Sequence, residues 1–72
     1  MTTKSIQFWV DPNGIIQFAD LLEKSELPNC IVGTDDDAVV VEVDYEPGKS
    51  KQLQHIADLQ ELEVTLHHEY LD

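Results

Sequence analysis

Residues 38–45 read AVVVEVDY, and this stretch decides the fold because it is the strongest strand signal in the chain. Its side chains alternate between two faces, and valine, being β-branched, favours strands. Val39, Val41 and Val43 share one face, which is therefore expected to lie on a hydrophobic core. A strand this apolar is predicted to occupy the centre of a sheet.

Two shorter strands are predicted upstream of it. Residues 5–10, SIQFWV, alternate with the same period and are also expected at the centre of the sheet. Residues 30–34, CIVGT, form a run that Gly33 weakens, as is typical of an edge strand. Asp35–Asp37 separate this run from residues 38–45 and are predicted to form a hairpin turn.

Chain breakers mark the starts of two predicted helices. Asp11 is a favoured helix cap and the proline after it suits the first helical position, so residues 12–25 are predicted to be helical. A proline and a glycine then interrupt the chain before Ser50, which can cap a short amphipathic helix over residues 50–60.

The last predicted strand covers residues 63–70, where Val64 and Leu66 alternate with polar residues. The resulting order, β-α-β-β-α-β, resembles the ferredoxin-like split β-α-β sandwich, an α+β architecture. It implies a four-stranded antiparallel sheet in the order fourth, first, third, second, with both helices on one face. The expected core is the set of apolar residues on the facing sides of the sheet and helices: Ile6, Phe8, Val10, Ile16, Ala19, Leu22, Val39, Val41, Val43, Leu53, Ile56, Ala57, Val64 and Leu66.

Size and charge exclude several classes of function. The chain has 72 residues, with 4 lysines, no arginine and 15 acidic residues, giving a formal charge of −11. A single domain of this length, residues 1–72, buries only about 60% of its unfolded surface and leaves no room for a substrate domain. Binding to nucleic acid or to an anionic membrane needs basic residues, so neither is expected. The sequence has no apolar leader and one cysteine, Cys30, which predicts a cytoplasmic protein without an internal disulfide.

No motif in the sequence predicts an enzyme, a cofactor or a metal site. Gly48-Lys49-Ser50 resembles the end of a phosphate-binding loop but lacks the upstream glycine, and Asp35–Asp37 lack the spacing of a calcium loop. His67 shares a face of the last predicted strand with Glu63 and Glu69. Whether these three bind a metal stays open, because one strand alone supplies too few ligands.

The predicted topology separates the charges along the molecule. All four lysines, Lys4, Lys24, Lys49 and Lys51, are expected at one end. The opposite end is predicted to form an acidic pole that consists of Asp11, Asp35, Asp36, Asp37, Asp58, Glu61 and Glu63. The leading hypothesis is therefore a non-enzymatic interaction module that docks this pole on a basic partner protein, in its sharpest form as a nucleic-acid mimic or inhibitor. Solubility and adaptation to high salt are alternative reasons for such acidity.

Trp9 suggests a second kind of function. Alternation places it on the helix-free face of the sheet, opposite its core-facing neighbours. An exposed tryptophan on an uncovered face is typical of a contact surface. The predicted face contains Gln7, Trp9, Val40, Glu42, Thr65 and His67. The alternative hypothesis is a structural or regulatory domain that forms a homodimer through this open face.

Overall fold

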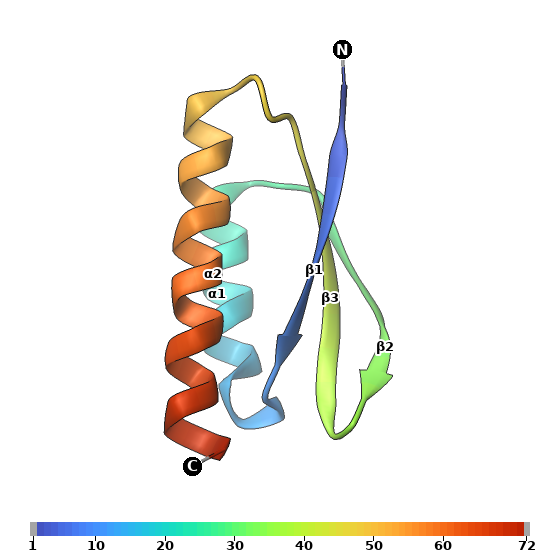
Figure 1. Ribbon diagram of the computed structural model, residues 1–72, viewed down its shortest axis with the longest axis vertical. Coiled ribbons are helices and arrows are strands. Elements are labelled where there is room, and N and C mark those ends of the chain that lie inside the picture. Colours follow the sequence, from blue (N-terminus) through green and yellow to red (C-terminus); the bar gives the residue numbers. More distant parts are fainter. Residues whose placement is uncertain (1, 72) are drawn as a thin grey trace.

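The computed structural model describes residues 2–71 and shows an α+β fold in two layers (Figure 1). Strand β1 is followed by a short 3-10 helix, η1, and by helix α1; the hairpin of β2 and β3 comes next, and helix α2 ends the fold. The elements are β1 (Lys4–Val10), η1 (Pro12–Gly14), α1 (Ile15–Ser25), β2 (Asn29–Asp35), β3 (Ala38–Tyr45) and α2 (Ser50–Leu71).

The sheet has three antiparallel strands in the order β1-β3-β2. β3 is central, as the AVVVEVDY pattern predicts, and β2 is an edge. β1 pairs with β3 from Lys4↔Tyr45 to Val10↔Val39 without interruption. The β2–β3 ladder contains a bulge between Ile31 and Gly33. The predicted order of the first three strands is retained, but β1 is an edge strand and not a central one.

The predicted fourth strand is wrong, and with it the four-stranded ferredoxin-like sandwich. Residues 63–70 belong to α2, which is 22 residues long. The chain has no glycine or proline after Gly48, so nothing interrupts the helix that starts at Ser50. Ile56, Leu59 and Leu66 are buried and share one face of α2. Their packing on the sheet favours a helix over the strand that the short alternation in residues 63–70 predicts.

Helix α2 takes the place that the missing strand would have had beside β1. It packs against β1, β3 and the antiparallel α1, and Figure 1 shows it running along the whole length of the sheet. The backbone N–H of Trp9 donates to Glu63 Oε2 across 2.8 Å. A side chain of α2 therefore accepts a hydrogen bond that a neighbouring strand would otherwise accept.

The core lies between the helix layer and the β1–β3 half of the sheet. Seven predicted core residues are buried, and Ile6 and Val39 pack against them in part. The buried seven are Phe8, Val10, Leu22, Val41, Val43, Ile56 and Leu66.

Five predicted core residues are exposed instead, four because the buried face of each helix differs from the predicted one, and Val64 because it belongs to α2 and not to a strand. They are Ile16, Ala19, Leu53, Ala57 and Val64. On α1 the buried face carries Phe18 and Leu22. The centroid of the Phe18 ring lies 5.2 Å from the centroid of the Phe8 ring. Leu27 and Leu59 complete the core.

Gly14 lets α2 approach closely at the lower end of the fold. A β-carbon on Gly14 would lie 2.6 Å from Leu66 Cδ2 and 2.8 Å from Leu66 Cδ1. Leu66 is itself 1% exposed and cannot swing into solvent without leaving the core. The contact holds the C-terminal half of α2 against η1, and this positions the residues described next.

Candidate functional site

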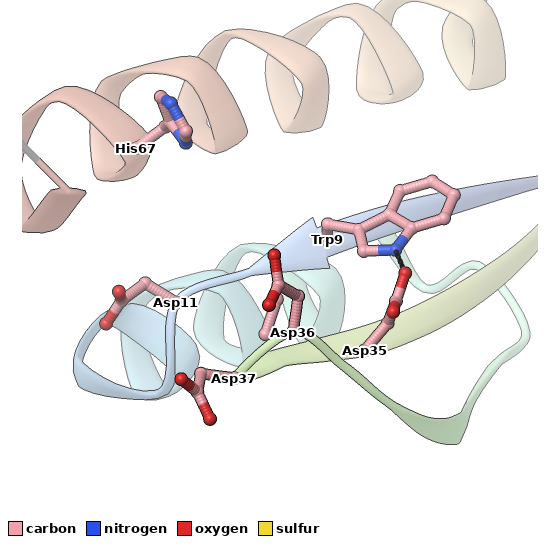
Figure 2. A pocket seen from close by; sticks show the side chains of 7 residues that line it. Trp9, Asp11, Asp35, Asp36, Asp37 and His67 are labelled. Carbon is pink, nitrogen blue, oxygen red and sulfur yellow. Dashed lines mark hydrogen bonds between the residues drawn. The ribbon is translucent and has the colours of Figure 1, made fainter.

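Three segments meet at the end of the molecule where α2 finishes. Figure 1 shows the β1–η1 connection, the β2–β3 turn and the last turns of α2 together at this end. They enclose an open pocket of about 280 Å³, shown in Figure 2. We call it the acidic pocket, and its lining residues are Trp9, Asp11, Asp35, Asp36, Asp37, Ala38 and His67.

The β2–β3 turn supplies three of the pocket's four carboxylates. Asp35 and Ala38 form the last pair of the ladder, and Asp36 and Asp37 make the two-residue turn with φ angles of 53° and 70°. Such a hairpin turn needs positive φ at both central positions, which aspartate tolerates better than most residues. The geometry of the turn therefore accounts for aspartate at both central positions, and it fixes the backbone that carries their carboxylates.

Two of the carboxylates are held by hydrogen bonds. Asp11 Oδ1 accepts from the backbone N–H of Asn13 at 2.9 Å and from Asn13 Nδ2 at 3.0 Å, so Asp11 caps η1 as its sequence predicts. Asp35 Oδ2 accepts from Trp9 Nε1 at 3.2 Å, the dashed line in Figure 2. The pocket is therefore partly ordered before any partner arrives.

Trp9 links this pocket to the helix-free face of the sheet. It pairs with Val40 in the ladder and lies on the same face. Its indole reaches across to Asp35 on β2, and Val40 beneath is only 7% exposed while Trp9 remains 47% exposed. The predicted orientation of Trp9, away from the core, is confirmed.

The structure brings part of the predicted acidic pole together and spreads the rest along α2. Asp11 and Asp35–Asp37 surround one pocket. Glu63, bonded to Trp9, lines a smaller adjoining pocket with Trp9, Val64 and His67. Asp58 accepts from Gln54 Nε2 at 3.0 Å midway along the helix, and Glu61 is exposed there. The wrong assignment of residues 63–70 caused this difference, because a continuous helix carries Asp58 and Glu61 away from the pocket.

The predicted open face is also only partly present. Gln7 and Glu42 are paired on the sheet, next to the pair formed by Trp9 and Val40. Thr65 and His67 were placed on this face wrongly, since both belong to α2. Thr65 donates its hydroxyl to the backbone of Glu61 at 3.0 Å. Whether any of these residues forms an interface stays a prediction.

His67 lines the acidic pocket from α2, a position that the predicted strand did not give it. In a helix, Glu63 and His67 are one turn apart and lie on the same face. Figure 2 shows His67 on α2, on the opposite side of the pocket from Asp36 and Asp37. The available sequence signal was the missing breaker between residues 60 and 63, which favours one long helix.

The lysines gather away from the pocket. Lys24, Lys49 and Lys51 line a shallow depression at the end where α1 finishes and α2 begins, and Lys4 starts β1. Two of them form exposed ion pairs, Lys24 with Asp20 at 3.5 Å and Lys49 with Glu46 at 2.7 Å. Exposed pairs of this kind stabilise the fold little.

The described residues include no arrangement of three or more His, Cys, Asp or Glu side chains that can hold a metal ion. His67 lines both the acidic pocket and the smaller adjoining pocket, Glu63 lines only the smaller one, and Glu69 lines neither. Gly48-Lys49-Ser50 connects β3 to α2, where Lys49 is paired with Glu46.

Comparison with models of known protein families, with curated proteins and with solved structures found no match. Neither helix within residues 2–71 combines the length and the apolar character of a membrane-spanning segment.

Proposed function

We propose that this protein is a non-enzymatic binding module that docks the acidic pocket on a basic surface of a partner protein. The observation that carries the proposal is the convergence of Asp11 and Asp35–Asp37, from two separate connections, around one pocket beside Trp9. No lysine lines that pocket. A lysine or arginine side chain of a partner would meet carboxylates and an aromatic ring there.

Long-range charge supports the same orientation. The chain carries −11 in total, and its lysines lie at the other end. The field around the acidic pocket therefore attracts basic surfaces and orients them before contact, which raises the rate of association. Asp11 and Asp35 are held by hydrogen bonds, so less side-chain entropy is lost when a partner binds.

Nucleic-acid mimicry is the sharper form of this proposal. Fixed carboxylates can pair with the same lysine and arginine groups that bind phosphates. In this form the partner is a nucleic-acid-binding protein, and the module inhibits it by occupying its site. A nucleic acid that carries the partner's site then competes with the module for binding.

The test replaces Asp35, Asp36 and Asp37 with asparagine. Asparagine also tolerates positive φ and its side-chain oxygen can still accept from Trp9, so the turn is expected to survive. A partner is first captured from the source cell on the immobilised native chain and identified. Association of the purified partner is then measured by surface plasmon resonance between about 0.05 and 0.5 M salt. We expect an on-rate about tenfold lower for the variant, and a weaker salt dependence.

A matched control separates the pocket from the total charge. Replacing Asp20 with Asn and Glu23 and Glu26 with Gln removes an equal number of charges from exposed positions on α1 and at its C-terminal cap, outside the acidic pocket. The control is expected to keep most of the native on-rate. If both triple variants slowed association equally, the acidity would serve solubility or high-salt adaptation and the pocket would not be a docking site.

Dimerisation through the open face around Trp9 remains the alternative. Trp9 is half exposed, but its indole is already engaged by Asp35 and covers Val40, and two of the six predicted residues are not on the sheet. These observations favour the acidic pocket as the principal site.

A further inference from the structure

Strand β2 is the most exposed element of the sheet. All seven of its residues are exposed, including Ile31 at 67% and Val32 at 48%. The helices pack on β1 and β3, so the helix side of β2 is left uncovered as well as its outer edge. Within residues 2–71 nothing pairs with that edge.

The hydrogen-bond pattern identifies the backbone groups that point outward. Asp44 donates its backbone N–H to the carbonyl of Pro28 at 2.9 Å. Opposite residues of an antiparallel ladder alternate between bonded and non-bonded pairs, so Cys30 bonds to β3 while Asn29 and Ile31 do not. The N–H and C=O groups of Asn29 and Ile31 therefore face the free edge.

We propose that two copies of this chain pair antiparallel through these edges of β2 and form one continuous six-stranded sheet. A two-fold axis that uses both outward-facing residues places Asn29 opposite the second copy's Ile31, and Ile31 opposite the second copy's Asn29. This register makes up to four backbone hydrogen bonds. It sets the two Cys30 residues opposite each other on the axis, and the bulge after Ile31 ends the regular pairing.

The charge distribution favours a second copy in this orientation. Residues 27–34 carry no charged side chain, although the whole chain has 15 acids. The antiparallel register places the two acidic turns, each centred on Asp36, on opposite sides of the axis and about 40 Å apart, well beyond the Debye length of about 8 Å. Each acidic turn then extends toward the end of the other copy that carries Lys24, Lys49 and Lys51.

The pairing also covers apolar surface that the monomer exposes. The two Ile31 side chains become diagonal neighbours across the axis, on the helix side of the sheet, where neither helix covers β2. About five residues a side make a small interface, so the dimer is weak and depends on concentration. Salt strengthens it, because both copies carry −11, whereas salt weakens docking on a basic partner.

Sedimentation equilibrium of the full chain under reducing conditions tests the pairing. We expect a monomer–dimer equilibrium that shifts toward dimer as salt rises. Ile31→Asp places a charge on each side of the axis and is expected to weaken the dimer by at least about tenfold. The matched control is Ile16→Asp on α1, an equally charged change at an isoleucine that is 81% exposed, and it is expected to leave the dimer intact.

Oxidation with diamide tests the register. Two thiols facing each other form one disulfide while diamide takes up the two electrons and two protons. Residues opposite each other at a non-bonded position lie about 4.5 Å apart at Cα, within disulfide range. Native Cys30 is expected to cross-link much faster than the thiol of a Cys30→Ser, Thr34→Cys variant, which the register places about 26 Å from its counterpart.

Three results would overturn the proposal. The native chain would stay monomeric at millimolar concentration, the two thiol positions would cross-link at equal rates, or the dimer would survive Ile31→Asp and be lost in Trp9→Ala. The last result would place the contact on the open sheet face.

Discussion

The two edge strands of the sheet differ in how far other elements cover them: β1 is covered by α2, and β2 is exposed. Along β1, α2 packs on the strand, and Glu63 accepts the outward N–H of Trp9 at 2.8 Å. Along β2 every residue is exposed, and the apolar side chains of Ile31 and Val32 face solvent. One long helix thus closes one edge and one half of the sheet, and it leaves the other half available for contacts. Three measurements test this difference, beginning with the largest expected effect.

Gly14→Ala tests how α2 is held beside β1. The new methyl group would lie 2.6 Å from Leu66 Cδ2 in a buried contact, so the helix or Leu66 must shift. We expect a loss of about 1–3 kcal/mol in the free energy of unfolding, measured by urea denaturation. Gly48→Ala is the control, because within residues 2–71 no atom lies within 4 Å of its β-carbon position. Equal stability of the two variants would show that α2 does not pack on η1 this closely.

Glu63→Ala tests the hydrogen bond that closes the edge of β1. Trp9 would lose the side chain that accepts its N–H, and we expect a loss of about 1 kcal/mol in the free energy of unfolding. Glu61→Ala removes the same group from an exposed position two residues earlier in α2 and is expected to change stability less. If Glu61→Ala destabilised the chain as much, the loss would reflect the helix and not the edge.

The part of the fold up to residue 45 could be predicted because two independent signals agree there. Strand alternation is bounded by breakers at Asp11-Pro12 and at the Asp35–Asp37 turn, so period and boundary support each other. Residues 63–70 show alternation with no breaker before them. That alternation is short. Ile56, Leu59 and Leu66 are spaced as on one face of a helix, and the burial of that face stabilises the helix over a strand. The sequence alone does not show that this face is buried.

Helix α1 shows a second limit of pattern reading. Residues 15–22 are apolar on most sides, so the sequence allows more than one buried face. Packing on β1 selects Phe18, whose ring meets that of Phe8, and it leaves Ile16 in solvent. The sequence predicts that α1 has a large apolar surface. Which part of that surface is buried depends on the side chains of β1 that it packs against.

The acidic pocket was predictable where it depends on strand direction alone. β1 and β2 both run toward the same end, so Asp11 and Asp35–Asp37, which follow or end those strands, gather there even though the sheet has three strands and not four. His67 depends on the path of α2 and was therefore misplaced. The interactions of Asp35 with Trp9 and of Glu63 with β1 are tertiary contacts that no local pattern encodes.

Hydrogen exchange at two single amides tests the difference between the edges most directly. In dilute solution we predict that the Trp9 N–H, bonded to Glu63, exchanges at least about tenfold more slowly than the outward-facing Ile31 N–H, after correction for intrinsic rates. Raising the protein concentration is predicted to slow Ile31 and leave Trp9 unchanged. Equal protection of the two amides in dilute solution would contradict the account, because one edge would then be no more closed than the other.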